Sequence, residues 1–263
     1  MDMARSIIIP AFNEEGRIGT TLASIERYFA QQPQDKAEVI VVCDGCRDRT
    51  EGTVKAFSQR LPLRLVSYKR NRGKGYAVRR GVAVSTGRVL AFMDADGATP
   101  VSEFGRLSRP ILSGRADIVV GSRRARGAKV RQQQSLLRQV LGRGFAWHAQ
   151  LVLGLKIRDT QCGFKVFDGE LARDLFRDLS CNGFAFDLEI LARARQRGLR
   201  VLEQGVEWHE RPGSSVHPFR DGLRMLSAVW RIRADLSTNK RGAGLCPPPG
   251  NPATSPLIAS LPQ

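Results

Sequence analysis

The chain has 263 residues, of which 42% are hydrophobic, so it can bury the core of one large domain or of two small ones. Its 42 basic and 25 acidic residues give a formal net charge of +17, which predicts an anionic partner such as nucleic acid, a membrane surface or a phosphorylated substrate. No segment reaches the roughly 18–20 apolar residues of a membrane-spanning helix, so we expect no transmembrane segment.

The first half of the chain alternates short apolar runs with helical patterns. The apolar runs of strand length are residues 6–10, 38–42, 63–68, 88–93 and 117–120. The segments with helical spacing are residues 14–31, 50–59, 75–84 and 101–112. Apolar strands that alternate with helices are typical of a parallel sheet covered on both faces, and such sheets bind ligands at the carboxyl ends of their strands.

After Gly121 the pattern changes. Residues 129–155 are basic at first and then apolar, and three glycines argue against one unbroken helix there. The elements predicted beyond this segment are strands at 165–167 and 201–208, and helices at 169–179, 186–197 and 219–236. The last of these helices is basic and amphipathic, which suits either a membrane surface or a helix docked on the domain. Residues 237–263 are rich in Pro, Gly and Ser and predict a disordered tail after one domain over 1–236.

Two acidic residues, Asp94 and Asp96, directly follow the fourth apolar run. Because residues two apart in a strand point the same way, both carboxylates face one side of the strand's carboxyl end. Paired carboxylates are suitable ligands for a divalent cation that bridges a diphosphate. The alternative is a solvated turn with two incidental acids, and the pair alone does not decide between the two readings.

Three further polar turns follow or connect the predicted strands. In the turn 10–15, Glu14 could bind ribose hydroxyls. Alternatively, the acidic residues of this turn only stabilise the N-terminus of the helix that follows. Asp44 could accept a hydrogen bond from a nucleobase, or it closes an ordinary Asp-Gly turn. In the cationic segment 71–75, Lys74 could neutralise a diphosphate or contact a base. Alternatively, the segment is a flexible basic loop.

The five cysteines and three histidines form no spaced ligand cluster. Cys43 and Cys46 are a Cys-X-X-Cys pair, but no second pair completes a zinc site, and we do not expect a redox role. The odd cysteine count and the lack of a signal peptide predict a reducing compartment.

Several motifs together resemble the inverting glycosyltransferases of family 2, which have the GT-A fold. The motifs that carry the resemblance, spread over about residues 4–235, are residues 8–15, 71–75, 94–99, 121–123, 158–165 and 186–189. Within the family, the chain is most similar to the dolichyl-phosphate β-glucosyltransferases and their polyprenyl-phosphate relatives. The resemblance implies an α/β fold with a Rossmann-like, mostly parallel central sheet, helices on both faces and C-terminal acceptor-binding helices. It also implies a nucleotide-sugar half over 1–121 and an acceptor half over 122–236.

The resemblance further implies roles for individual residues. Those expected to bind the nucleotide sugar are Pro10, Ala11, Glu14, Asp44, Lys74, Asp94 and Ala95. Asp94 and Asp96 form the Asp-X-Asp (DXD) motif that would hold Mg²⁺ or Mn²⁺ against the diphosphate, and the residues assigned to catalysis are Asp96 and Asp159. Asp159 would lie beside the donor sugar, or it caps a turn before Thr160. Those expected to engage the acceptor phosphate are Arg123, Arg131 and Arg138.

The implied reaction moves glucose from UDP-glucose to dolichyl or polyprenyl phosphate and gives a β-linked product. The acceptor phosphate is already anionic at neutral pH, so no strong general base is required. A metal would offset charge on the departing UDP, and arginines would hold the incoming phosphate in line. We expect a cytoplasmic enzyme that associates peripherally with an anionic membrane surface and has no specific nucleic-acid partner.

Alternatives stay open at the level of the sequence. The family usually has an aspartate where this chain has Cys43, which leaves room for another donor such as GDP-mannose or for a soluble sugar acceptor. A basic nucleic-acid-binding protein is the alternative from a different class, and it leaves Asp94 and Asp96 unexplained. A nucleotide-binding scaffold without activity is a third reading.

Overall fold

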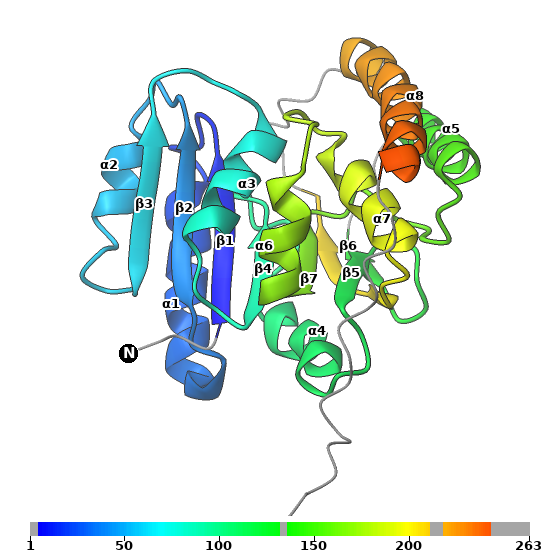
Figure 1. The fold of residues 1–263 in the computed structure, drawn as a ribbon. Coiled ribbons are helices and arrows are strands. Elements are labelled where there is room, and N and C mark those ends of the chain that lie inside the picture. Colours follow the sequence, from blue (N-terminus) through cyan, green and yellow to red (C-terminus); the bar gives the residue numbers. More distant parts are fainter. Residues whose placement is uncertain (1–4, 132–135, 211–217, 243–263) are drawn as a thin grey trace, which may run out of the picture.

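A single seven-stranded sheet organises the computed structural model, which describes residues 5–131, 136–210 and 218–242 (Figure 1). The strands, in the order in which they lie in the sheet, are β3 (Leu63–Tyr68), β2 (Glu38–Asp44), β1 (Arg5–Ala11), β4 (Val89–Met93), β7 (Phe164–Asp168), β5 (Ile118–Ser122) and β8 (Val201–Gly205). All neighbouring pairs are parallel except those of β7, which runs antiparallel to both β4 and β5. The predicted mostly parallel sheet is confirmed.

The antiparallel direction of β7 follows from the edge of the sheet at which the strand begins. β5 ends at the carboxyl edge of the sheet, and β7 begins at that same edge, since Phe164 pairs with Met93 at the end of β4. A strand that begins at the edge where β4 and β5 end has to run antiparallel to both of them. A pattern of apolar runs indicates that a strand is present but not in which direction it runs in the sheet.

Helices cover both faces of the sheet. They are α1 (Ile18–Gln31), α2 (Thr50–Lys55), α3 (Lys74–Val84), α4 (Glu103–Leu112), α5 (Leu136–Leu153), α6 (Gly169–Arg177), α7 (Phe186–Gln196) and α8 (Pro218–Gly242), with a short 3₁₀ turn η1 (Pro33–Asp35). Among these described helices, none is both long and apolar enough to cross a bilayer. The predicted segment 129–155 divides into a short strand, β6 (Lys129–Arg131), and α5, whose interior tolerates Gly142 and Gly144.

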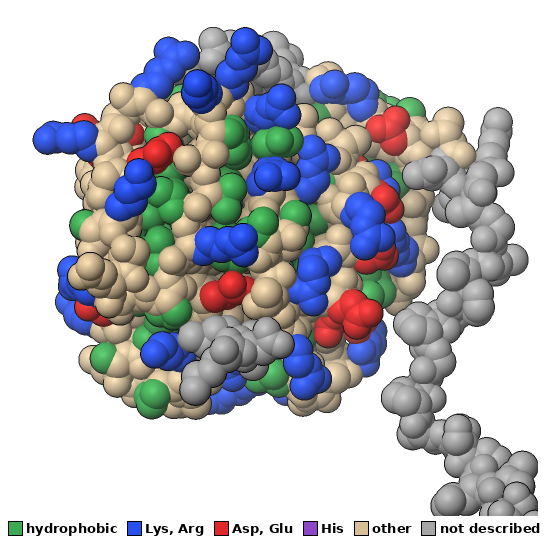
Figure 2. Space-filling view, turned by 60° about the vertical axis from the view of Figure 1, so that its left-hand side comes forward, with side chains coloured by type: hydrophobic (Ala, Val, Ile, Leu, Met, Phe, Trp, Pro, Cys, Tyr) green, Lys and Arg blue, Asp and Glu red, His purple; other side chains and the backbone are tan. Residues whose placement is uncertain are grey.

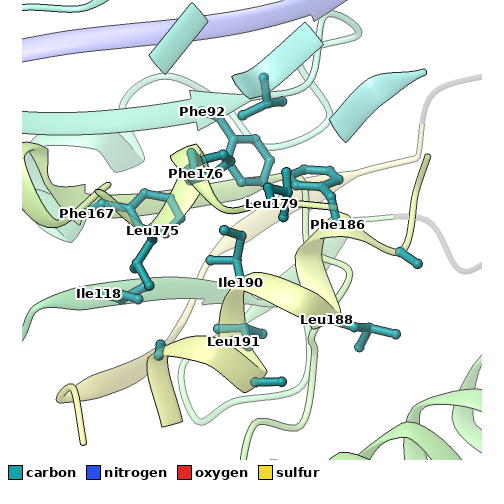
Figure 3. Close-up of a cluster of buried hydrophobic side chains, with 14 of the residues drawn as sticks. Phe92, Ile118, Phe167, Leu175, Phe176, Leu179, Phe186, Leu188, Ile190 and Leu191 are labelled. Atoms are coloured by element: carbon teal, nitrogen blue, oxygen red, sulfur yellow. The ribbon is translucent and has the colours of Figure 1, made fainter. Parts of the chain in front are cut away.

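The alternation of side chains along β1 explains why both faces are buried. Ile7 and Ile9 belong to a core on the side of α1, α2 and α4, while Ile8 belongs to a second core on the side of α3, α6 and α7. In this second core Phe92, Phe167, Phe176 and Phe186 pack ring against ring, with centroids 5.4–6.4 Å apart (Figure 3). The four rings fix α6 and α7 beside the end of β4, because Phe92 lies only two residues before Asp94.

The predicted strand 201–208 is two strands in the structure. β8 ends at Gly205, and β9 (Glu207–His209) pairs with β6 in a separate two-stranded sheet. A Cβ atom at position 205 would lie 2.4 Å from the backbone N of Ala128, so only glycine lets the chain pass so close there. At the C-terminus, α8 runs to Gly242, beyond position 236; the rest of the predicted tail, 243–263, lies outside the described residues.

Candidate active site

The candidate site lies at the carboxyl edge of the sheet, where three neighbouring strands end. β1 lies between β2 and β4, and all three are parallel, so the turns after Ala11, Asp44 and Met93 meet at one edge. The N-terminus of α3, with Lys74 as its first residue, lies at the same edge. The topology therefore collects these predicted residues at one edge of the sheet.

Asp94 is held from two sides. Its Oδ1 lies 2.6 Å from the Nζ of Lys74, and its backbone N–H donates a 3.0 Å hydrogen bond to the carbonyl of Gly163. Burial acts to lower the pKa of Lys74, but the carboxylates of Asp94 and Asp187 outweigh it and the pKa is raised. Lys74 is therefore a permanent cation placed directly against the first acid of the Asp-X-Asp motif.

Asp96 and Glu14 add further negative charge beside Asp94. Burial and the neighbouring charge of Asp94 raise the pKa of Asp96, whose Oδ1 accepts the N–H of Ala98 at 2.9 Å. Burial also raises the pKa of Glu14, and the charges of Asp96 and Asp94 add to this, while an ion pair with Arg17 at 2.7 Å opposes it. A divalent cation bound between these carboxylates would relieve the repulsion that raises their pKa values.

The donor set suits a cation shared with a ligand rather than one enclosed by protein. In the described part of the chain, no group of three or more His, Cys, Asp and Glu side chains is arranged to hold a metal ion by itself. Asp94 and Asp96 would supply two carboxylates, and diphosphate and water oxygens would complete the shell.

Asp44 holds a loop in place. It is 3% exposed, and its two carboxylate oxygens accept the backbone N–H groups of Arg72 and Gly73 at 2.7 and 2.8 Å. Gly73 has φ +100°, a left-handed conformation that favours glycine. Because this loop leads into α3, Asp44 indirectly positions Lys74. Its predicted contact with a nucleobase stays a prediction, since carboxylate oxygens can accept further hydrogen bonds.

Asp159 and Arg123 form a buried, two-pronged ion pair. The Nε and Nη2 atoms of Arg123 each lie 2.8 Å from a carboxylate oxygen of Asp159, and the backbone N–H of Arg123 donates to the same group at 2.9 Å. Burial acts to raise the pKa of Asp159, but Arg123 outweighs it and the pKa is lowered. Asp159 is 2% exposed, so in this arrangement it positions Arg123. Its predicted place beside the donor sugar stays a prediction.

Two neighbours complete the setting of this ion pair. Glu203 accepts the backbone N–H groups of Arg158 and Asp159 at 3.0 and 2.9 Å. The guanidinium carbon of Arg123 lies 5.5 Å from the ring centre of Trp208, within the range of a cation–π contact. The Arg123 side chain keeps 25% of its surface exposed, so the ion pair does not enclose it completely.

The remaining predicted residues are less closely grouped. Pro10 and Ala11 are buried at the end of β1, and the carbonyl of Ala95 accepts the hydroxyl of Thr21 at 2.7 Å. Arg131 lies on β6 and pairs with Glu207 at 3.3 Å, largely exposed. The side chain of Arg138 lies outside the described part of the structure.

Sequence reasoning missed a second buried ion pair. Lys165 and Asp187 are 0% and 3% exposed, and their Nζ and Oδ1 atoms are 2.6 Å apart. Lys165 also donates to the carbonyl of Cys162 at 2.8 Å, and burial raises the pKa of Asp187 despite Lys165 and Lys74. The signal was present, because a lone lysine inside the apolar run 164–167 requires a buried acid as partner.

Comparisons with known proteins agree with this geometry. The family model "Glycosyl transferase family 2" matches residues 6–176, and the chain belongs to this family of sugar-transferring enzymes. Among its relatives is the dolichyl-phosphate beta-glucosyltransferase of Dictyostelium discoideum, 35% identical over 87% of this chain and 73% of the relative. The enzymes of that name from Drosophila melanogaster and Homo sapiens are 38% and 32% identical, over 86% and 89% of this chain and 74% and 79% of theirs.

Solved structures confirm the predicted GT-A fold. Mannosyl-3-phosphoglycerate synthase from Rubrobacter xylanophilus superposes with a TM-score of 0.64 at 21% identity, over 95% of this chain and 79% of its own. Glucosyl-3-phosphoglycerate synthase from Mycobacterium tuberculosis, solved with Mn²⁺, UDP-glucose and phosphoglyceric acid, gives the same TM-score and identity over 88% of this chain and 80% of its own.

Proposed function

We propose that this chain transfers glucose from UDP-glucose to dolichyl or polyprenyl phosphate, with inversion and with help from Mg²⁺ or Mn²⁺. The observation that carries the proposal is the group formed by Asp94, Asp96, Glu14 and Lys74 at the carboxyl edge of the sheet. The names of the relatives support the sugar and the lipid acceptor. The M. tuberculosis complex supports a manganese-assisted nucleotide sugar in this fold.

Each residue of the site has a physical task in this reaction. Asp94 and Asp96 would hold the cation, which would offset the charge that develops on the departing diphosphate. Lys74 adds a fixed positive charge beside them, and Asp44 keeps the loop before it in place. Because these charges are set before the sugar leaves, they need not reorganise during the reaction.

The acceptor side of the proposal rests on Arg123. A phosphate monoester carries charge at neutral pH and attacks without a general base. The N–H groups of the Arg123 guanidinium that do not bond Asp159 would bind that phosphate, while Asp159 holds the Nε and Nη2 side. Attack from the side opposite the leaving diphosphate inverts the linkage from α to β. This division of work leaves the acid pair to the leaving group and the arginine to the nucleophile.

A membrane surface is the expected place of action, because the proposed acceptor is a lipid and the net charge is +17. The nucleic-acid alternative finds no support on the face shown in Figure 2, where Lys and Arg side chains are scattered widely instead of following one stripe.

The experiment is a transfer assay with a short polyprenyl phosphate dispersed in detergent. We expect UDP-glucose and Mg²⁺ or Mn²⁺ to give a glucosyl phospholipid, and a chelator to stop the reaction. Asp94→Asn should lower turnover at least about 100-fold, whereas Asp174→Asn, at an exposed aspartate on α6, should not. Undiminished turnover in Asp94→Asn would refute the metal assignment, and consumption of GDP-mannose in place of UDP-glucose would refute the donor.

A further inference from the structure

Two helices outside the site carry large apolar side chains on their outer surfaces. On α5, the exposed side chains Arg143, Trp147 and Leu151 recur every fourth residue, so they form one stripe along the helix. Trp147 and Leu151 are 64% and 60% exposed. The opposite side of α5 is buried through Ala149 and Leu153, which belong to the core. The exposed stripe is therefore not what attaches the helix to the core.

The outward face of α8 repeats this arrangement. Leu226 and Trp230, one turn apart, are 36% and 56% exposed, and Arg231 beside them is exposed as well. Val229 and Ile232 fill the buried side of the helix. Both helices are therefore amphipathic in an unusual sense, because each has an apolar inner stripe and a second apolar stripe, mixed with arginine, on the outside.

The two outer stripes lie next to each other. α5 packs against α8, and the rings of His148 and Trp230 have centroids 6.0 Å apart. Figure 1 shows the two helices side by side at the end of the molecule toward which β1 and β2 point, and far from α4. We define the α5–α8 face as Arg143, Trp147, Leu151, Leu226, Trp230 and Arg231.

We propose that the α5–α8 face docks on the surface of an anionic lipid bilayer, with the two tryptophans in the headgroup region. Tryptophan has an apolar body and a polar N–H, and it is enriched where membrane meets water. Two of the three tryptophans of the chain lie on this face. Arg143 and Arg231 would meet lipid phosphates, and the net charge of +17 attracts the protein to such a surface.

A second copy of the chain fits this face less well. In a two-fold dimer, the face would meet itself and bring Arg143 and Arg231 of both copies into one interface. Like charges across an interface repel one another, whereas an anionic bilayer supplies opposite charge over the whole face. Docking there would also bring the site's end of the sheet toward the membrane in which the proposed acceptor lies (Figure 1).

The test measures binding to vesicles that contain neither acceptor nor nucleotide. Wild-type protein should sediment with vesicles of phosphatidylcholine and phosphatidylglycerol, and less with phosphatidylcholine alone. The double variant Trp147→Ala/Trp230→Ala should bind about tenfold more weakly, while Leu112→Ala should bind like the wild type. Leu112 is the matched control because it is 56% exposed but lies on α4. Equal binding by the double variant and the wild type would overturn the proposal.

A second measurement keeps the test independent of the double variant's folding. In Trp208→Phe only Trp147 and Trp230 remain as tryptophans, and brominated lipids should quench their fluorescence. Absence of quenching would overturn the proposal, as would a lipid-free dimer that Trp147→Ala/Trp230→Ala dissociates.

The docking proposal and the proposed function fail separately. Vesicle binding by a protein that transfers no sugar would refute only the function. Transfer to the detergent-dispersed acceptor, combined with no vesicle binding, would refute only the docking.

Discussion

Gly163 lies directly against the Asp94 carboxylate, and this packing suggests a substitution that tests the site. A Cβ atom at position 163 would lie 2.0 Å from the Oδ2 and 2.4 Å from the Cγ of Asp94. The two backbones cannot separate easily, because the N–H of Asp94 donates to the carbonyl of Gly163. Gly163 does not have a positive φ, so alanine is conformationally acceptable there. Gly163→Ala should therefore move the Asp94 carboxylate and leave the backbone in place.

The size of the effect follows from this distance. An ordinary contact begins near 3.4 Å, so the Oδ2 atom of Asp94 has to move by about 1.4 Å. The Oδ1 atom, which belongs to the same carboxylate and lies against Lys74, has to move with it. A misplacement of about 1 Å costs on the order of 100-fold in rate, or about 2.7 kcal/mol of transition-state stabilisation. We expect kcat/KM to fall by this amount and the concentration of Mn²⁺ needed for half-maximal rate to rise.

The assay is the transfer reaction, with thermal unfolding measured in parallel. Gly52→Ala is the control, because nothing lies within 4 Å of a Cβ added there. It should keep full turnover and stabilise the helix α2 by up to about 1 kcal/mol. In an Asp94→Asn background, Gly163→Ala should add little, since both changes act through the same carboxylate.

Turnover of Gly163→Ala within twofold of the wild type, with an unchanged metal requirement, would refute the reasoning. In that case the position of the Asp94 carboxylate would not matter to the reaction. A further 100-fold loss in the double variant would also refute it, because Gly163 would then act by another route.

Three further predictions concern buried or perturbed groups. Lys165→Met should lower the free energy of unfolding in urea by about 3–5 kcal/mol, because it removes the direct ion-pair partner of the buried Asp187. Lys165→Met/Asp187→Leu should recover most of that loss, and no recovery would contradict the ion-pair argument. The pKa of Asp159 is lowered by Arg123, so its stabilising contribution is present above pH about 4 and is lost as pH falls further. The free energy of unfolding in urea should therefore fall more steeply below about pH 4 for the wild type than for Asp159→Asn; parallel curves would count against it. A hydrogen bond with Cys43 lowers the pKa of Cys46 to about 7, so iodoacetamide at neutral pH should alkylate Cys46 at least about tenfold faster than Cys181, as peptide mass spectrometry would show.

The acid pair shows how far the sequence leads. Spacing and the preceding apolar run place Asp94 and Asp96 at a strand's carboxyl end, and the strand order brings Glu14 to the same edge. These are consequences of local periodicity and of parallel topology, which a single sequence carries. The family resemblance was needed to select a nucleotide sugar from the possible diphosphates.

The partners of the buried charges could not be obtained in this way. Asp159 pairs with Arg123 across 36 positions, and Lys165 pairs with Asp187 across 22 positions. Such pairs depend on how the loops after β5 and β7 fold back on the sheet, which no local pattern describes. For the same reason Asp44 could be placed at the edge, but its use by the loop before α3 could not be foreseen.

The position of β7 also has a consequence for how the chain acquires its structure during synthesis. β7 separates β4 from β5, so β5 joins the sheet only through β7 and β8, which emerge about forty residues or more after it. Until then β4 has one unpaired edge and β5 has two, and unpaired edges are prone to aberrant association. A ribosome-bound chain that ends before Phe164 should therefore need protection by a chaperone, and the sheet is completed late, when β7 pairs between β4 and β5.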